Sequence, residues 1–270
     1  MHTNYSDGVD SPTRVVERAV ELGLAALAVT DHDSVGGLEE AQAAANEQGL
    51  EFLPGVEISA GFGHIWVHVV GLGIDAANEP LGAALSKLQA GRVTRAVQMI
   101  ERLNELDVPV DFEKVRARTA DGIIGRLHIA QEIEAIGFAK TVQGAFDRYI
   151  GVGRPAYVPK LRIPCEDAIA LVHQADGLAV LGHPGLGGVK ARLSTLLCLP
   201  FDGVEVYHSK HTPGETQAFA QVAAERGLLV SGGSDCHGNA KKQKAEMGTV
   251  RVPYECFQRI KEALGKDAGK

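Results

Sequence analysis

Cysteine is scarce in this chain, and its cysteines are not paired along the sequence. Cys165, Cys198, Cys236 and Cys256 are the four cysteines among 270 residues, and no two of them form a C-x-x-C motif. Disulfide frameworks and thiolate zinc sites usually show such spacing, so the sequence argues against both and suits a reducing cytoplasm. Cys236 stands inside a motif of metal-ligand residues, where we expect a small packing residue and not a ligand.

The chain also lacks a long apolar run and a secretion signal. No stretch approaches 18 consecutive apolar residues, although 45% of the residues are hydrophobic, so no membrane span is expected. A secretion signal would begin with a charged segment followed by an apolar one, and the chain does not open in this way. We therefore expect a cytoplasmic protein without a membrane partner.

Positive charge is the third scarce feature, since the formal net charge is -7. Proteins that track long nucleic acids usually carry a basic stripe. The one dense basic stretch is Lys241-Lys242-Gln243-Lys244, which we expect to be a solvated loop. The composition favours a small phosphorylated nucleotide or a short oligonucleotide as partner over a long duplex.

Strands and helices alternate in the first and last parts of the chain. Ser11 and Pro12 predict a helix start, because serine is a good N-cap and proline fits the first helical position. A second helix is predicted over residues 38–48, before Gly49. Short apolar runs predict strands over residues 24–30, 52–56, 65–67, 178–182 and 228–231. This alternation is typical of a parallel α/β sheet or barrel.

The pattern becomes wholly helical between about residues 76 and 157. Helices are predicted over residues 80–106, 112–118, 126–136 and 142–149, and the Gly-rich residues 151–155 suit a linker. We therefore predict two domains, a barrel formed by residues 1–75 and 158–270 and a helical insertion, 76–157, that serves as a lid. A chain of 270 residues is long enough for such a barrel with an inserted lobe.

Residue types that bind metals stand where these apolar runs end. They are Asp31-His32-Asp33, Glu57, His68, His183 and Asp235-Cys236-His237. In a parallel barrel such ends converge on the face that carries the chemistry. Imidazole and carboxylate ligands without thiolate suit Mn, Fe or Zn. We predict a site with several metal ions, in which Glu57 bridges two of them and Asp31 orients an imidazole or a water.

Six motifs along nearly the whole chain resemble those of the PHP (polymerase and histidinol phosphatase) superfamily of metal-dependent phosphoesterases. The motifs are His2-Thr3-Asn4-Tyr5-Ser6-Asp7-Gly8, Thr30-Asp31-His32-Asp33, Gly55-Val56-Glu57, His68-Val69-Val70-Gly71, Gly182-His183-Pro184-Gly185 and Gly233-Ser234-Asp235-Cys236-His237. Within the superfamily the chain is most similar to small bacterial enzymes that act on nucleoside 3′,5′-bisphosphates and to related enzymes that act on short RNA.

This resemblance implies a fold and a set of site residues. The implied fold is a distorted (β/α)7 barrel with a helical insertion lobe. The implied metal ligands are His2, Asp7, His32, Glu57, His68, His183, Asp235 and His237. The implied substrate-binding residues are Arg126, His128, Arg154 and His211, and an arginine fork suits phosphate better than lysine does. The family motif begins with a strand and Asp-Leu-His-x-His, so we expect the natural protein to carry several more residues before Met1.

The activity that the resemblance implies is hydrolysis of the 3′-phosphate of a nucleoside 3′,5′-bisphosphate by a hydroxide that bridges metal ions. Two or three divalent ions are expected, with manganese first and iron or zinc as alternatives. Two related activities stay open, namely a 5′-3′ exoribonuclease on short RNA and a nucleoside monophosphate phosphatase. A non-catalytic metal-dependent binding module and the C–N hydrolysis of amidohydrolases are the further alternatives.

Overall fold

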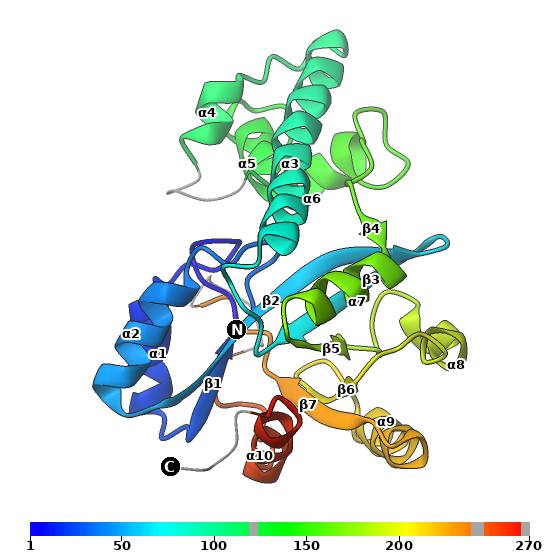
Figure 1. Cartoon of the computed structure of the whole chain (residues 1–270). Coiled ribbons are helices and arrows are strands. Elements are labelled where there is room, and N and C mark those ends of the chain that lie inside the picture. The colour runs from blue at the N-terminus through cyan, green and yellow to red at the C-terminus, as the bar shows by residue number, and fades with distance from the viewer. Residues whose placement is uncertain (119–123, 239–245, 266–270) are drawn as a thin grey trace. The chain divides into compact units, whose positions relative to one another are not determined.

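A computed structural model describes residues 1–118, 124–238 and 246–265 (Figure 1). The chain forms two compact units, one of Met1–Leu85 with Arg162–Lys270 and one of Ser86–Leu161. The basic stretch 241–244, expected to be a solvated loop, lies outside the described residues.

The first unit is built on a seven-stranded sheet. Its strands are β1 (Ala26–Val29), β2 (Glu51–Phe62), β3 (Ile65–Leu72), β4 (Ile163–Pro164), β5 (Leu178–Leu181), β6 (Gly203–His208) and β7 (Leu229–Gly233). They follow the order β1-β2-β3-β5-β6-β7, and β4 pairs with β2 off this path. The β1–β2, β2–β4, β5–β6 and β6–β7 pairs are parallel. Together with the surrounding helices, this sheet confirms the predicted α/β class.

The hairpin of β2 and β3 differs from the prediction. Strands were expected to end just before Glu57 and His68, but both residues lie inside long antiparallel strands, with Glu57 opposite Val70 and Ser59 opposite His68. The prediction was wrong because a polar side chain on one face does not end a strand when the next residue points to the other face. The hairpin closes through two residues, Gly63 and His64, and Gly63 has the positive φ of 56° that suits such turns.

Helices cover the outside of this sheet, and their ends follow from local sequence. They are α1 (Pro12–Glu21), α2 (Leu38–Gln48), α7 (Cys165–Gln174), α8 (Leu193–Leu196), α9 (Pro213–Arg226) and α10 (Tyr254–Ala263), with a 3₁₀ helix at Val189–Arg192. Ser11 caps α1 by accepting a hydrogen bond from the Arg14 amide, and α2 ends at Gly49 with a φ of 67°. Helix α1 therefore begins, and α2 begins and ends, where the sequence predicts.

Within its described residues, the regular elements of the second unit are all helical. Its elements are most of α3 (Glu79–Glu105), then α4 (Phe112–Arg116), α5 (Arg126–Ala135), α6 (Val142–Ala145) and a π-helical turn at Phe146–Ile150. They enclose a hydrophobic core of their own, which includes Met99, Leu103, Ile129, Ile133 and Ile150. Buried apolar side chains of this kind supply the main stabilising free energy of such a unit.

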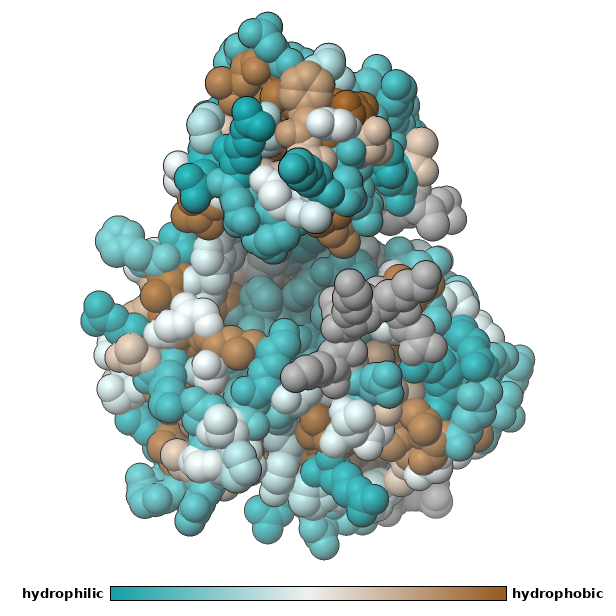
Figure 2. Space-filling model, turned by 180° about the vertical axis from the view of Figure 1, so that it is seen from behind, coloured by the Kyte–Doolittle hydropathy of each residue, from teal (hydrophilic) through white to brown (hydrophobic). Residues whose placement is uncertain are grey.

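The surface carries hydrophobic side chains in small groups. On the face shown in Figure 2, they are scattered among hydrophilic residues. Within the described residues, no helix combines the length and the apolar character needed to span a lipid bilayer.

Candidate metal centre

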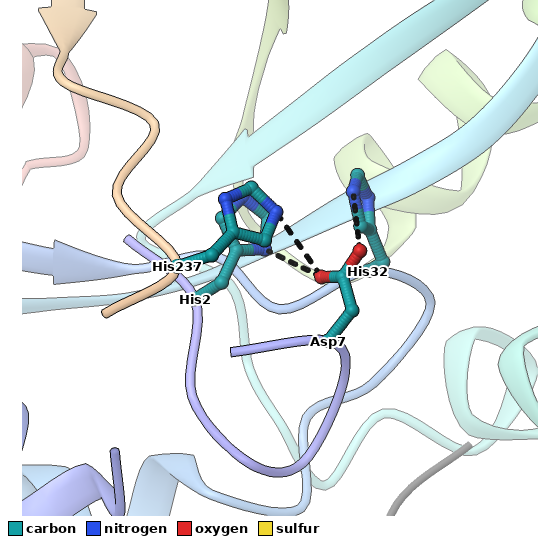
Figure 3. A group of neighbouring side chains, drawn as sticks. All are labelled: His2, Asp7, His32 and His237. Atoms are coloured by element: carbon teal, nitrogen blue, oxygen red, sulfur yellow. Dashed lines mark ion pairs between the residues drawn. The ribbon is translucent and has the colours of Figure 1, made fainter. Parts of the chain in front are cut away.

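The first residues of the chain lie between the end of β1 and the segment that follows β7. The Thr30 amide donates a hydrogen bond to the Met1 carbonyl at 2.9 Å, and the His2 amide donates to the Cys236 carbonyl at 3.1 Å. These bonds bring the His2 ring onto the ring of His237, with the ring centroids 4.1 Å apart (Figure 3). Residues from opposite ends of the sequence thus meet at one place.

Four predicted ligands form a first group at this place. The ligand atoms of His2, Asp7, His32 and His237 all lie within 4.8 Å of one another (Figure 3). The Asp7 carboxylate is 3.1 Å from Nε2 of His237 and 4.0 Å from Nε2 of His32. Its side chain is 51% exposed, whereas the His2 side chain is 1% exposed. The group therefore faces solvent on the Asp7 side.

Glu57 joins this group to the remaining ligands. Two further groups with mutually close ligand atoms are His32–Glu57–His68 and His2–Glu57–Asp235. Nε2 of His183 lies 3.1 Å from the Glu57 carboxylate, so the structure brings all eight predicted ligands together. Because the Glu57 carboxylate faces imidazoles on several sides, it has the position expected of a bridging ligand. The ligand roles themselves stay a prediction.

The acids of the centre are held in their ionised form. Burial alone would raise the pKa of Glu57, but His32 and His68 beside it hold that pKa well below the usual range. Burial would likewise raise the pKa values of Asp7 and Asp235, but contacts with histidines, first His237 and His2 respectively, lower both. Ionised carboxylates are the form that binds metal ions.

Three imidazoles of the centre have pKa values that are shifted in opposite directions. Burial lowers the pKa of His32 to about 3, so its ring is neutral near pH 7. Burial also opposes the charge on His2 and His183, but their carboxylate partners prevail and raise the pKa values to about 10 and about 9. Without a metal ion these two rings carry a proton that a metal ion would have to displace.

The donor set fits divalent metal ions. Among the described residues, Nδ1 of His2, His32 and His183 is buried without a hydrogen-bond partner. A buried polar atom without a partner costs free energy, and a metal ion bound to these rings would remove that cost at the ligating nitrogens. The Sγ atom of Cys236 accepts a hydrogen bond from the Gly238 amide at 3.3 Å, in keeping with the packing role expected for this residue. Imidazole and carboxylate donors suit Mn, Fe or Zn.

Two residues of β6 support the centre; the sequence left His208 open between a wall of the site and the surface, and Glu205 carried no prediction. The Glu205 carboxylate accepts a hydrogen bond of 2.6 Å from the backbone amide of His183, whose φ of 25° is unusual for a residue with a side chain. The Nε2 atom of His208 lies 3.6 Å from the Asp235 carboxylate. A glutamate between valines in a buried strand was the available signal for Glu205.

His211, predicted to contact the reacting phosphate, lies at the turn after His183. Its Nδ1 donates to the Val206 carbonyl at 3.0 Å, and its Nε2 accepts from the Gly185 amide at 3.2 Å. A side chain at Gly185 would meet the His211 ring at 2.7 Å, so glycine is required there. The phosphate contact stays a prediction, since both ring nitrogens bind backbone in this arrangement.

The other predicted substrate residues belong to the second unit. The Arg126 guanidinium lies 5.5 Å from the centroid of the Phe146 ring and 5.9 Å from that of Tyr157. Arg95 lies 5.8 Å from the same Tyr157 ring, and its pKa is lowered to about 10, first by burial and then by the charge of Arg126. Nδ1 of His128 accepts from the Gly125 amide at the start of α5. Arg154 is exposed.

Comparisons with known proteins agree with this geometry. The PHP domain model matches residues 1–109. A 3′,5′-nucleoside bisphosphate phosphatase of Chromobacterium violaceum is 39% identical over 263 residues, which cover 95% of this chain and 92% of that one. A 5′-3′ exoribonuclease of Haemophilus influenzae is 35% identical over 241 residues, with 87% and 88% of the two chains covered.

A solved structure extends the agreement to the fold. The crystal structure of a Bifidobacterium adolescentis protein, assigned as a metal-dependent phosphoesterase, is 32% identical and has a TM-score of 0.84 over 96% of this chain and 93% of that one. This similarity confirms the predicted barrel type. The chain belongs to the PHP-domain family of metal-dependent phosphoesterases, which are phosphoric ester hydrolases.

Proposed function

We propose that the protein removes the 3′-phosphate of nucleoside 3′,5′-bisphosphates such as 3′-phosphoadenosine 5′-phosphate. The observation that carries this proposal is the position of Glu57, whose carboxylate belongs to two of the three groups of candidate ligand atoms. A carboxylate in that position could bind two neighbouring metal ions. A pair of neighbouring metal ions is the arrangement that suits hydrolysis of phosphate esters. The bisphosphate substrate is supported by the 39% identical phosphatase of Chromobacterium violaceum.

Two or three divalent ions, manganese first and iron or zinc as alternatives, are proposed as cofactors. The three groups His2–Asp7–His32–His237, His32–Glu57–His68 and His2–Glu57–Asp235 would hold them, with His183 beside Glu57. When bound, such ions neutralise the phosphate and make hydroxide available near neutral pH.

The side chains of the proposed centre contribute negative charge, a neutral imidazole ligand and an open side for the substrate. Glu57, Asp7 and Asp235 are ionised and offset the charge of bound cations. His32 is held neutral by burial, so that a lone pair is available without loss of a proton. Asp7 stands on the solvent side, where a substrate phosphate can approach.

The helical insertion is proposed to bind the second phosphate and to act as a lid. In this proposal residues 1–75 and 158–270 form the catalytic barrel, and residues 76–157 form the insertion that carries Arg126, His128 and Arg154. Support comes from the guanidinium groups of Arg126 and Arg95, which lie near the same Tyr157 ring, and from the pKa of Arg95, which is lowered first by burial and then by the charge of Arg126. A bound phosphate would neutralise this repulsion. His211 is retained as a candidate for the reacting phosphate.

A short RNA is the second candidate substrate. It is supported by the exoribonuclease of Haemophilus influenzae, which is 35% identical over 87% of this chain. The same metal centre would serve both substrates, because both reactions transfer a phosphoryl centre to water. The protein is proposed to act in the cytoplasm, where a reducing environment suits its four free cysteines.

Specificity constants for three substrates distinguish these candidates. We would compare 3′-phosphoadenosine 5′-phosphate, AMP and a short 5′-phosphorylated RNA in the presence of manganese, with chelator-treated protein as control. The proposal expects the highest kcat/KM for the bisphosphate and AMP as its product. A preference for the RNA would establish the second candidate. A preference for AMP would indicate a monophosphatase, and binding of metal without any turnover would indicate a binding module or hydrolysis of another bond.

A further inference from the structure

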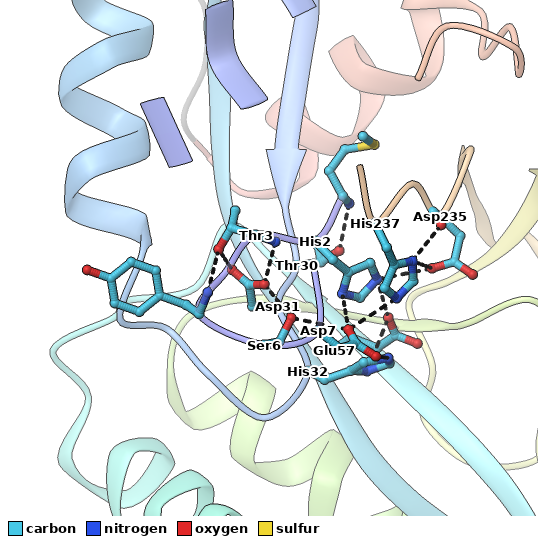
Figure 4. A network of polar contacts seen from close by, with 12 residues as sticks. His2, Thr3, Ser6, Asp7, Thr30, Asp31, His32, Glu57, Asp235 and His237 are labelled. Atoms are coloured by element: carbon cyan, nitrogen blue, oxygen red, sulfur yellow. Dashed lines mark hydrogen bonds and ion pairs between the residues drawn. The ribbon is translucent and has the colours of Figure 1, made fainter. Parts of the chain in front are cut away.

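Asp31 is a buried carboxylate that accepts hydrogen bonds from a backbone amide and from hydroxyl groups, and not from the imidazoles of the centre. It is 1% exposed, although it directly precedes His32. The sequence predicted that it would orient an imidazole or a water. Its carboxylate instead accepts hydrogen bonds from the Thr3 amide at 2.7 Å, the Thr3 hydroxyl at 2.6 Å and the Ser6 hydroxyl at 2.5 Å (Figure 4). All three donors belong to the loop of residues 3–8.

Thr3 is the residue around which this loop turns. Its carbonyl accepts hydrogen bonds from the Ser6 amide at 3.1 Å and from the Gly8 amide at 3.0 Å. The turn is so tight that a side chain at Gly8 would lie 2.5 Å from the His2 carbonyl oxygen. Asp7 stands between the two residues whose amides close the turn. Thr3 therefore fixes the backbone of Asp7, and Asp31 in turn fixes the backbone of Thr3.

Asp7 needs such support more than the other candidate ligands do. Its side chain is 51% exposed, whereas those of His32 and His237 are 14% exposed and packed in the centre. An exposed side chain has few packing contacts that restrict its rotamers. Its carboxylate can stay near the imidazoles only if the backbone beneath it is held still.

We propose that Asp31 is a positioning residue, which holds the Asp7 carboxylate and His2 in the metal centre by fixing the loop of residues 3–8 through Thr3 and Ser6. The role depends on the proposed metal centre, since the loop matters for function only if Asp7 binds a metal ion. It concerns the two groups that contain Asp7 or His2, whereas the group His32–Glu57–His68 contains neither residue. Loss of the Asp31 carboxylate should therefore weaken metal binding where Asp7 or His2 is a ligand. It should spare metal binding by His32, Glu57 and His68.

The test compares Asp31→Ala with Asp31→Asn by manganese titration and by hydrogen exchange of residues 3–8. Asp31→Ala should weaken one class of manganese site about 10- to 100-fold, the usual effect of losing a residue that orients a ligand, and should speed exchange at the Thr3 amide. Asp31→Asn should restore most of both properties. Its amide oxygen can accept from the Thr3 amide and the Ser6 hydroxyl, and its nitrogen can donate to the Thr3 hydroxyl.

Asp202→Ala is the matched control. Asp202 also holds backbone, since it accepts a hydrogen bond of 2.7 Å from the Ala179 amide, but it lies outside the three groups of ligand atoms. This variant should lower stability without a change in manganese affinity. A weakened manganese site in the control would show that loss of stability alone explains the Asp31 result, and would overturn the proposal.

Two results with Asp31 itself would also overturn it. One is manganese binding by Asp31→Ala with wild-type affinity at every site. The other is an equal loss in Asp31→Ala and Asp31→Asn, which would mean that the charge of Asp31 acts on the metal ions and its hydrogen bonds do not. If Asp31→Ala does not fold, Thr3→Val and Thr3→Ser make the same comparison, because only the serine keeps the hydroxyl. If the wild-type protein binds no manganese, the proposed function fails, while faster exchange of the loop in the metal-free Asp31→Ala protein still tests the hold on Thr3.

Discussion

Replacing Glu57 by glutamine removes one negative charge from the middle of the candidate metal centre. Glu57 is 3% exposed and lies 3.2 Å from Nε2 of His2 and 3.1 Å from Nε2 of His183. Removing one partner of a buried charge pair costs about 3–5 kcal/mol. Because each 1.4 kcal/mol is a factor of ten, we expect Glu57→Gln to weaken metal binding by about two to three and a half orders of magnitude.

The assay is competition between the protein and a fluorescent chelator for manganese, which gives both the number of bound ions and their affinity. Glu51→Gln is the matched control, because Glu51 lies on the same strand but pairs with Tyr254 and Lys261 outside the centre. An exposed pair of this kind contributes at most about 1 kcal/mol, and the control should bind manganese normally. Normal manganese binding by Glu57→Gln would refute the bridging position of Glu57.

Four further predictions concern other residues of the two proposed sites. His237→Ala should abolish phosphate release, because the ring lies 3.1 Å from Asp7 in the first ligand group; full activity would contradict the metal assignment. Metal binding at pH 7 should release protons, because the pKa values of His2 and His183 are raised to about 10 and about 9 in the metal-free protein. Calorimetry in buffers of different ionisation enthalpy measures this release. By the same linkage, the stabilisation of the metal-free protein from these two rings is present below pH 6.5 and lost as pH rises through about 9 to 10, which thermal unfolding against pH would show. Arg126→Ala should raise KM for bisphosphates more than for monophosphates, and equal losses would refute its role with the second phosphate.

Much of the α/β unit could be predicted because its signals are local. Ser11 with Pro12 and the glycine after residue 48 mark helix ends by their own backbone preferences. The ligand types at the ends of β1, β5 and β7 also stood out, since polar residues there interrupt apolar runs. Their meeting in one place could be inferred from the way strand ends converge.

What could not be predicted depends on contacts between distant segments. Glu57 and His68 looked like strand ends, and only the pairing of β2 with β3 shows that both strands continue past them. Asp31 was predicted to orient an imidazole or a water, but its donors Thr3 and Ser6 lie 28 and 25 residues earlier in the sequence. Glu205 carried no motif of its own, and its role appears only from its bond to the backbone of His183.

The number of metal ions bound by each chain tests the central claim most directly. The protein would be stripped with chelator, reloaded with excess manganese, separated from free metal and measured by elemental analysis. A centre in which Glu57 joins neighbouring groups of ligands predicts two or three ions per chain. One ion or none at saturation would contradict it, because a single ion leaves no neighbour for Glu57 to bridge.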